Sequence, residues 1–276
     1  MTEARFEFGK NWASYAEGVG AAQVDHATRC LENLVPRESL TGKSFLDLGC
    51  GSGLHSLAAL RLGAARVTAI DYDPVAVETA RRLLSLHGAT GNGGATVRQG
   101  DILRLTPAAI GRHDIVYSWG VLHHTGDMFA AIARAAALTR PEGLLVLALY
   151  RRTPLCPAWR IEKRIYSASP AWLQDAILAA YMAAYRLRLA LTGTDYAAFL
   201  ADYVQARGME FRHNARDWLG GYPYESIAPD RLRSLMAEMG FREVRTVVAP
   251  AHWGLFGSGC DEYVFRAPSE PAAVSA

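Results

Sequence analysis

The chain has 276 residues, of which 50% are hydrophobic and 20% are charged, and its formal net charge is +2. This composition is typical of a globular protein with one large core and room for an insertion. The small net charge argues against a general attraction to nucleic acid or to an anionic membrane, so we expect neither as a partner.

Three further features argue against a targeted, membrane-spanning, disulfide-rich or metal-binding protein: the N-terminus, the longest apolar segment and the cysteines. MTEARFEFGKNW carries acidic residues and no apolar centre, so we predict no targeting peptide and a cytoplasmic protein. The apolar segment 171–192 contains Asp175, Arg186 and Arg188, which favour a buried or interfacial helix over a membrane span. The four cysteines are scattered and form no C-x-x-C pair, so neither a disulfide framework nor a metal site is expected.

Apolar runs of strand length alternate with helix-like segments through the first half of the chain. Strands are predicted at 43–48, 66–70, 95–99, 113–118 and 143–149, with helices at 54–62, 74–87, 103–111 and 128–139 between them. This alternation is typical of an α/β protein with a doubly wound parallel sheet.

The alternation stops after the fifth predicted strand and resumes near the C-terminus. Residues 151–228 are helical by composition and contain no strand-like run. A helix then begins at Pro229 and ends near Gly240, and FREVRTVVA and CDEYVFRA read as two strands. These last strands predict a mixed sheet with an antiparallel edge.

The segment FLDLGCGSG, residues 45–53, combines an apolar strand with a glycine-rich turn. Gly49, Gly51 and Gly53 have the spacing G-x-G-x-G, which lets the backbone turn tightly into a helix and admits a ligand where a Cβ would collide. Asp47 adds a carboxylate just before the turn, and Cys50 is interpreted as a small residue that fits inside it. Dinucleotide sites use G-x-G-x-x-G instead, so a nicotinamide dehydrogenase is disfavoured.

Carboxylates follow the second and third predicted strands, where ligands of open α/β sheets bind. Asp71 is placed to accept two ribose hydroxyls, and Tyr72 could lie against a purine face. Asp73 precedes Pro74 and is explained as a helix N-cap, whereas Asp71 has no such local explanation. Asp101 could accept from an adenine amino group, or could equally cap the next helix.

The fourth predicted strand ends in YSWGVLHHTGD, residues 117–127. Ser118, Trp119, His123 and His124 are therefore expected at the mouth of the site. The two histidines are the base candidates, because a histidine pKa suits proton transfer near neutral pH. The alternative is that they make local hydrogen bonds at the start of a helix.

In combination, these motifs resemble the class I S-adenosylmethionine-dependent methyltransferases, and among them the group similar to ubiquinone and menaquinone biosynthesis (type 11) methyltransferases. The resemblance covers about residues 5–150 closely and 229–266 by architecture. It implies a Rossmann-like seven-stranded mixed sheet with a helical cap after the fifth strand. It also implies S-adenosylmethionine as methyl donor and S-adenosylhomocysteine as product.

The resemblance assigns roles to the residues named above. The turn from Gly49 to Gly53, with Asp47, borders the methionine part of the cofactor, and Asp71 holds the ribose. The remaining expected cofactor contacts are Tyr72, Asp101 and Ile102 near the adenine, and Ser118 and Trp119 on the methionine side.

The N-terminal segment RFEFGKNWASYAE, residues 5–17, resembles the lid of this family. Trp12 and Tyr15 share a helix face and are expected over the cofactor, whereas Phe6 and Phe8 are expected to pack on the core. Packing on its own core and exchange with a partner subunit of a homo-oligomer both remain open. The expected organisation is a lid (1–40), a cofactor-binding core (41–150), an acceptor cap (151–228), the end of the core (229–266) and a tail (267–276).

Acceptor recognition is expected from the cap, which is rich in aromatic residues. The loop-like segment DWLGGYPYE places Trp218, Tyr222 and Tyr224 together. A basic run that begins with Arg151 and Arg152 could grip an acidic group of the acceptor, although a solvated surface explains most of its members. An RNA acceptor is disfavoured, because it requires a broader basic surface.

The predicted function is in-line transfer of a methyl group from S-adenosylmethionine to oxygen or carbon of a hydrophobic small molecule. Natural-product, isoprenoid and quinone-like acceptors of a biosynthetic, secondary-metabolic enzyme fit the aromatic cap. The alternatives are N-methylation of a small molecule and a methyltransferase-like subunit that binds the cofactor without turnover.

Overall fold

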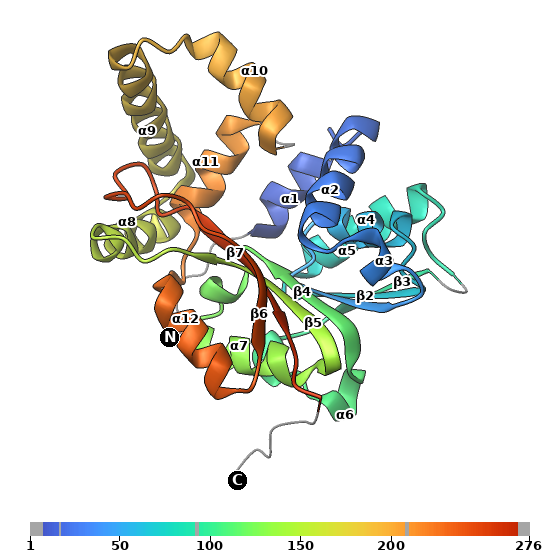
Figure 1. Ribbon diagram of the computed structural model, residues 1–276. Coiled ribbons are helices and arrows are strands. Elements are labelled where there is room, and N and C mark those ends of the chain that lie inside the picture. The colour runs from blue at the N-terminus through green and yellow to red at the C-terminus, as the bar shows by residue number, and fades with distance from the viewer. Residues whose placement is uncertain (1–7, 17, 92–93, 208–209, 270–276) are drawn as a thin grey trace.

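The computed structural model describes residues 8–16, 18–91, 94–207 and 210–269 (Figure 1). The strands are β1 (Ser44–Leu48), β2 (Arg66–Asp71), β3 (Ala95–Gln99), β4 (His113–Trp119), β5 (Thr139–Tyr150), β6 (Arg242–Val247) and β7 (Cys260–Arg266). The α-helices are α1 (Phe8–Ala16), α2 (Ala21–Leu34), α3 (Arg37–Leu40), α4 (Leu54–Arg61), α5 (Pro74–Leu86), α6 (Pro107–Ile110), α7 (Met128–Ala137), α8 (Cys156–Ala168), α9 (Ala171–Leu191), α10 (Tyr196–Arg207), α11 (Phe211–Gly220) and α12 (Pro229–Glu238). Two 3₁₀ turns are η1 (Ile102–Arg104) and η2 (Leu122–His124).

The described strands form one seven-stranded sheet in the order β3-β2-β1-β4-β5-β7-β6. Strands β1 to β5 are parallel, and β7 runs antiparallel to both β5 and β6. The predicted mixed sheet with an antiparallel edge is therefore confirmed. Strand order reverses between β1 and β4, so their carboxyl ends flank the point at which open sheets of this kind bind ligands.

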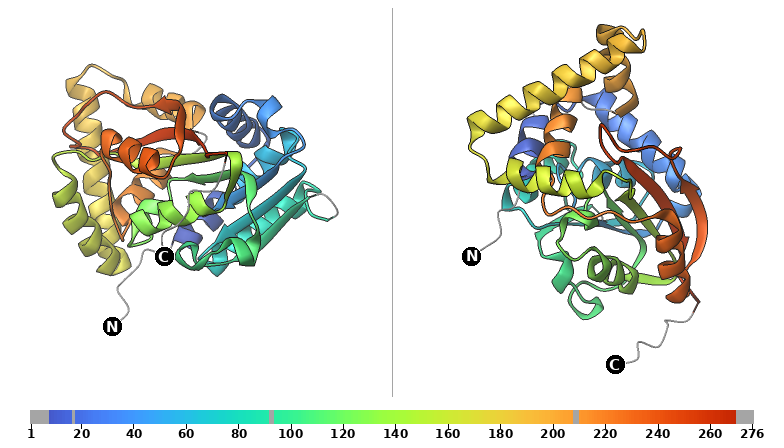
Figure 2. Two further views of the ribbon diagram at one scale, coloured as in Figure 1. Left: turned by 60° about the horizontal axis from the view of Figure 1, so that its bottom comes forward. Right: turned by 90° about the vertical axis from the view of Figure 1, so that its left-hand side faces the viewer.

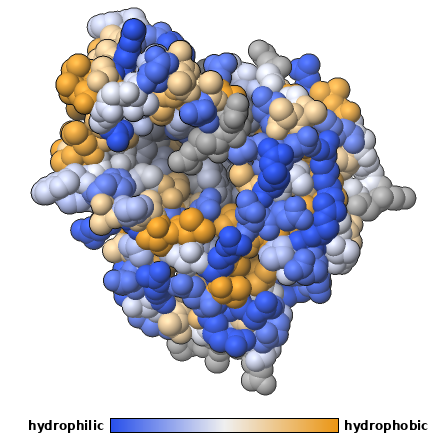
Figure 3. Space-filling model, turned by 45° about the horizontal axis from the view of Figure 1, so that its top comes forward, coloured by the Kyte–Doolittle hydropathy of each residue, from blue (hydrophilic) through white to orange (hydrophobic). Residues whose placement is uncertain are grey.

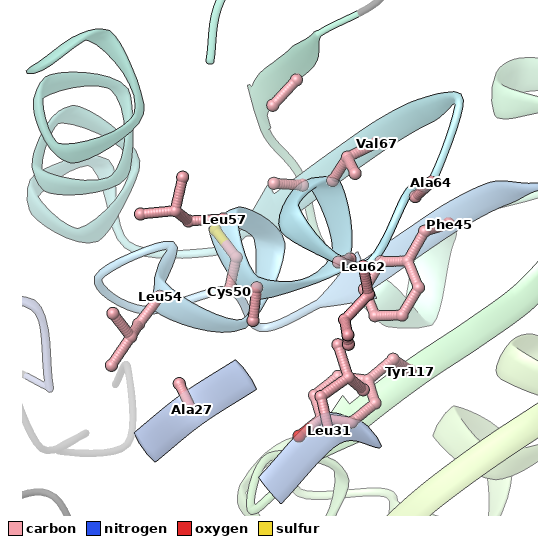
Figure 4. Packing of buried hydrophobic residues seen from close by; sticks show 14 of the residues in the cluster. Ala27, Leu31, Phe45, Cys50, Leu54, Leu57, Leu62, Ala64, Val67 and Tyr117 are labelled. Carbon is pink, nitrogen blue, oxygen red and sulfur yellow. The ribbon is translucent and has the colours of Figure 1, made fainter. Parts of the chain in front are cut away.

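Side chains of the central strands alternate between two hydrophobic cores. Phe45 and Tyr117 pack with α2, α4 and α5 on one face (Figure 4), and Leu46 and Val116 pack with α7 and α12 on the other. Figure 2 shows helices on both faces of the sheet. Burial on both faces explains why these strands read as continuous apolar runs rather than as alternating patterns.

Two sequence predictions differ from the structure. The helix expected at 103–111 is replaced by η1 and the short α6. Pro107 lacks an amide hydrogen and disfavours helical geometry at the preceding residue, so a helix cannot run through it. The expected tail also begins later, because the Ala267 amide donates to Gly143 and Pro268 accepts from Glu142. Phe6 and residues 270–276 lie outside the described residues.

The helical segment α8–α11, called the insertion below, leaves the sheet and returns at one point. The Ile227 amide donates to the Tyr150 carbonyl at 3.0 Å, and Arg151 forms a parallel bridge with Ile227. The helices of the insertion gather beyond one end of the sheet (Figure 1) and share a third core that includes Tyr166, Leu178 and Trp218. Among the described residues, no helix is both long and apolar enough to cross a membrane.

A buried ion pair fixes the start of the insertion to the last strand. Arg151 Nε lies 2.8 Å from Asp261 Oδ2, and both side chains are at most 9% exposed. The guanidinium also donates to the Ala249 carbonyl, while Asp261 Oδ1 accepts from the Ala249 amide at 3.1 Å. Three segments that are distant in sequence therefore meet at this pair.

Replacing Asp261 with alanine is expected to lower the free energy of unfolding by about 3–5 kcal/mol, because it leaves a buried guanidinium without its partner. Urea unfolding followed by circular dichroism measures the change. Arg152→Ala, which alters the exposed neighbour, serves as the control and should have almost no effect. A similar small loss in Asp261→Ala would show that the pair contributes little to the fold.

Candidate active site

The glycine turn after β1 has a conformation that side chains would block. Gly49, Gly51 and Gly53 have φ angles of 79°, 53° and 80°. A Cβ on Gly49 would lie 2.4 Å from a methyl carbon of Val121, and one on Gly51 would lie 3.2 Å from the Trp12 indole. The turn is tied to β2, because the Gly49 amide donates to the Ile70 carbonyl at 2.7 Å.

Asp71, at the end of β2, holds this turn in place. Its Oδ2 accepts from the Gly51 amide and its Oδ1 from the Asp73 amide, both at 2.9 Å. The sequence-based view that Asp71 has no structural explanation is therefore wrong. A carboxylate can accept about four hydrogen bonds, so these two leave capacity for ligand hydroxyls. Burial raises the pKa of Asp71, and the two amide donors oppose that rise.

Asp47 is a buried carboxyl group beneath the turn. It is 2% exposed and accepts a hydrogen bond from the Ser56 hydroxyl at 2.7 Å. Burial, aided by the negative charge of Asp71, raises the pKa of Asp47 from 3.8 to about 7, although the Ser56 bond opposes the shift. A site of this kind favours a cationic group, which would return the carboxyl group to its charged form.

The residues expected near an adenine are placed by local interactions. Asp101 accepts from the Leu103 amide at 3.0 Å and caps η1, which is the structural alternative considered for it. Ile102 is buried in the core formed with α7, and Tyr72 is 56% exposed beside the end of β2. Cys50 is buried within the turn, and burial raises the pKa of its thiol well above the ordinary range, as expected for a packing residue.

Ser118 and Trp119, at the end of β4, differ in accessibility. The Ser118 side chain is fully buried and its hydroxyl donates to the Leu48 carbonyl at 2.9 Å, which joins β4 to β1. The expectation that Ser118 lies on the methionine side of the cofactor stays a prediction. Trp119 is half-buried, and its indole Nε1 donates to Glu262 Oε1 at 2.8 Å.

Helix α1 covers the turn within the same chain. The Gly9 amide donates to Asp73 Oδ2 at 2.9 Å, and Trp12 lies edge-to-face with Tyr15 at 5.6 Å between ring centres. The Trp12 indole lies over Gly51, and the role of Trp12 and Tyr15 as a lid over the cofactor stays a prediction. The prediction that Phe8 packs on the core is wrong, because the centre of its ring lies 5.0 Å from that of the His124 ring.

The two histidines after β4 have different environments. His123 is fully buried, and its Nδ1 accepts from the Tyr150 amide at 3.3 Å. Burial, with the nearby His124 and Lys163, lowers the pKa of His123 well below its ordinary value. His124 Nδ1 lies 2.8 Å from the Pro223 carbonyl, which can only accept, so the neutral ring carries its lone pair on Nε2. Of the two rings, His124 is therefore the one whose neutral form has its acceptor nitrogen at Nε2, and its role as a base stays a prediction.

Trp218 and Tyr224, two of the residues expected to bind an acceptor, pack edge-to-face with 6.0 Å between ring centres. Trp218, Tyr222 and Tyr224 are all buried, and the Tyr224 hydroxyl lies 3.2 Å from both Cys156 Sγ and Ser258 Oγ. Arg151 has a structural role instead, because its guanidinium is buried, pairs with Asp261 and donates to the Ala249 carbonyl.

Sequence reasoning missed the buried Lys163 and the contact between α1 and α11. Lys163 was grouped with a basic surface run, but it follows Cys156 and Trp159 at helical spacing on the buried stripe of α8. Asn11 Nδ2 donates to Asp217 Oδ1 at 2.7 Å, which connects α1 to the insertion. Burial raises the pKa of Asp217 to about 7. Figure 3 shows the surface hollowed where the insertion faces the N-terminal helices.

Comparison with known proteins agrees with this geometry. Residues 46–147 match the family described as a methyltransferase domain. The chain is 38% identical over 124 residues to a ubiquinone biosynthesis O-methyltransferase of Xanthomonas campestris, a match that covers 45% of this chain and 50% of that protein. The chain thus spans about half the length of the relatives it matches.

Solved structures extend the likeness of fold to more than nine tenths of the chain. Magnesium protoporphyrin IX methyltransferase from Synechocystis PCC 6803 with bound SAH superposes with a TM-score of 0.56 at 17% identity, covering 94% of this chain and 93% of that chain. An S-adenosylmethionine-dependent methyltransferase from Mesorhizobium loti has a TM-score of 0.52 at 17% identity, with coverage of 91% and 99%. The fold is therefore that of class I methyltransferases.

Asp47→Asn is expected to stabilise the protein at pH 8. The folded state binds a proton on Asp47 up to about pH 7, whereas an unfolded aspartate loses it near 3.8, so stability falls as the pH rises between these values. The substitution should raise the free energy of unfolding at pH 8 by about 2–4 kcal/mol and leave it nearly unchanged below pH 4. Urea unfolding at both pH values checks this, and an equal effect at each would show that the carboxyl charge is not involved.

Proposed function

We propose that this chain, whose residues 46–147 form a methyltransferase domain, transfers a methyl group from S-adenosylmethionine to an oxygen atom of a small-molecule acceptor. The observation that carries the proposal is the glycine turn, which Asp71 holds at the reversal of strand order and which Trp12 and Val121 contact. In S-adenosylmethionine the methyl group is bonded to a positively charged sulfur. The neutral thioether that remains after transfer is a good leaving group. The protein must then align the acceptor, exclude water and manage one proton.

The described residues fit such a cofactor. The Gly49–Gly53 turn offers backbone without side chains, the Asp71 carboxylate retains acceptor capacity for ribose hydroxyls, and the buried Asp47 suits the cationic amino group of a methionine moiety. Tyr72 and Asp101 lie after the neighbouring strands, where an adenine would extend. Trp12 and Tyr15 would shield the bound group from water.

Oxygen is favoured as the methylated atom because a base is available. A hydroxyl acceptor must lose its proton, and His124 Nε2 carries a lone pair while the Pro223 carbonyl fixes the ring through Nδ1–H. The relatives named as ubiquinone biosynthesis O-methyltransferases support the same chemistry, over the matched half of their length. Trp218, Tyr222 and Tyr224 would form the hydrophobic wall of the acceptor site, which fits an aromatic or quinone-like molecule.

Asp71→Ala tests the ribose contact. Affinity for S-adenosylhomocysteine, measured by calorimetry, should fall at least about tenfold, because a hydrogen bond to a charged group is lost. Since Asp71 also braces the turn, a loss of affinity alone could reflect a distorted turn.

A ligand-side control separates the two causes. The 2′-deoxy analogue of S-adenosylhomocysteine should bind the wild type more weakly than the parent compound. The Asp71→Ala variant should bind both compounds equally, because the hydroxyl has lost its partner. If removal of the hydroxyl weakens binding to the same extent in both proteins, Asp71 does not contact the ribose.

His124→Gln tests the base. Once a screen with labelled methyl groups has identified an acceptor, kcat should fall by about 10²–10⁴ while affinity for S-adenosylhomocysteine is unchanged. Thr125→Ala, a change to the following residue, is the matched control and should retain most of the activity. Wild-type kcat in His124→Gln would exclude proton transfer through this ring.

A further inference from the structure

Three buried side-chain donors lie where α8, α11 and η2 pack around Tyr150. Lys163 Nζ, His123 Nε2 and Trp218 Nε1 are each without a hydrogen-bond partner among the described residues. Lys163 and His123 are 0% exposed and Trp218 is 7% exposed, so water does not replace the missing partners at the surface. More than about 90% of buried polar groups in native proteins are hydrogen-bonded, which makes a group of three exceptional.

The three side chains belong to one continuous cluster. Lys163 Nζ lies 3.6 Å from the centre of the Trp218 ring, and the Tyr150 ring lies 5.1 Å from Trp218 and 3.8 Å from the His123 ring. Tyr224 and Trp159 are the next rings around Lys163 Nζ, at 5.3 and 6.0 Å. The donors are therefore surrounded by aromatic faces.

All three atoms are donors rather than acceptors. An ammonium group and an indole nitrogen can only donate. His123 Nδ1 accepts from the Tyr150 amide, so the hydrogen of the neutral ring is on Nε2. A ligand that satisfied this cluster would therefore present lone pairs, and an anionic oxygen would also balance the ammonium charge.

The acidic groups nearby do not provide this partner by hydrogen bonding. Asp217 Oδ1 accepts from Asn11, and both oxygens of the buried Glu162 carboxyl group lack hydrogen-bond partners among the described residues. Burial raises the pKa of Glu162 and lowers that of Lys163, and the attraction between the two charges opposes these shifts only in part.

We propose that Lys163, His123 and Trp218 bind an anionic oxygen of the acceptor, and that the acceptor is an aromatic acid whose ring packs among the surrounding aromatic side chains. The inference rests on the proposed function, because it identifies the bound molecule with the methyl acceptor. The cluster adjoins the methyl-transfer site, since His123 precedes His124 and Asn11, which contacts Asp217, precedes Trp12. The flexible four-carbon stem of Lys163 lets Nζ move from the Trp218 face to meet an incoming oxygen.

Benzoate, with benzamide as its uncharged counterpart, probes this site. Each compound is titrated into wild type, Lys163→Met and Arg164→Met, with and without S-adenosylhomocysteine, and tryptophan fluorescence reports binding. Arg164 is the exposed neighbour on the same helix and provides the matched loss of one positive charge. Wild type and Arg164→Met should prefer benzoate by at least about tenfold, and Lys163→Met should lose this preference.

The melting temperature of Lys163→Met provides a second test. If Lys163 stabilised the fold, the substitution would lower Tm, whereas the proposal predicts that Tm does not fall. Lys163→Met removes a buried ammonium without a hydrogen-bond partner and keeps its apolar stem, so Tm should be unchanged or rise by about 2–4 °C. A marked fall in Tm would assign Lys163 to the stability of the fold and overturn the proposal.

Three binding results would also overturn it: no saturable benzoate signal in the wild type, equal affinity for benzoate and benzamide, or a preference for benzoate that survives in Lys163→Met. The proposed function has its own test. If calorimetry without benzoate detects no binding of S-adenosylhomocysteine, the proposed function is wrong. A protein that prefers benzoate through Lys163 but does not bind S-adenosylhomocysteine would keep the anion site and lose the methyltransferase assignment.

Discussion

The two hydrogen bonds accepted by Asp71 are the interaction on which the site depends. They fix the glycine turn through Gly51 and the start of the β2–α5 connection through Asp73. Asp73 in turn accepts from Gly9 and so positions α1, and α1 reaches the insertion through Asn11 and Asp217. One carboxylate at the end of β2 thus begins a chain of contacts that joins the cofactor half of the site to the acceptor half. The Asp71 carboxylate has enough lone pairs to brace the backbone and to make the proposed contact with a ribose as well.

The buried charged residues discussed above fall into two groups. In one group the protein compensates the charge fully, and in the other it does so only in part. Arg151 and Asp261 satisfy one another and the Ala249 backbone, so their cost of burial is balanced within the fold. Asp47 and Lys163 are also buried, but burial raises the pKa of Asp47 to about 7 and lowers that of Lys163, because their hydrogen bonds and nearby charges offset the cost of burial only in part. Groups poised in this way cluster at functional sites, where a ligand completes their surroundings. The contrast supports a structural role for the first pair and a binding role for the second two residues.

Much of the fold was predictable because the strands are buried on both faces and therefore read as uninterrupted apolar runs. The glycine turn was predictable for a similar reason, since no other residue type fits its φ angles beside Val121. The sequence did not reveal which residues that are far apart in the chain contact one another. Arg151 pairs with Asp261, which is 110 residues away, and Lys163 is buried although it lies between the charged residues Glu162 and Arg164. Ser118 shows the same limit, because the strand-end position was correctly predicted while its partner, the Leu48 carbonyl, belongs to another strand.

The meeting of Tyr150 and Ile227 at the base of the insertion has an evolutionary consequence. Because the chain leaves and rejoins the sheet at one place, the intervening helices can lengthen, shorten or be exchanged without changing the register of any strand. The residues proposed to hold the methyl donor and those proposed to meet the acceptor therefore lie mainly in different stretches of the chain. In such an enzyme, replacement of the insertion between Tyr150 and Ile227 can change the acceptor, while the residues proposed to bind the methyl donor stay the same.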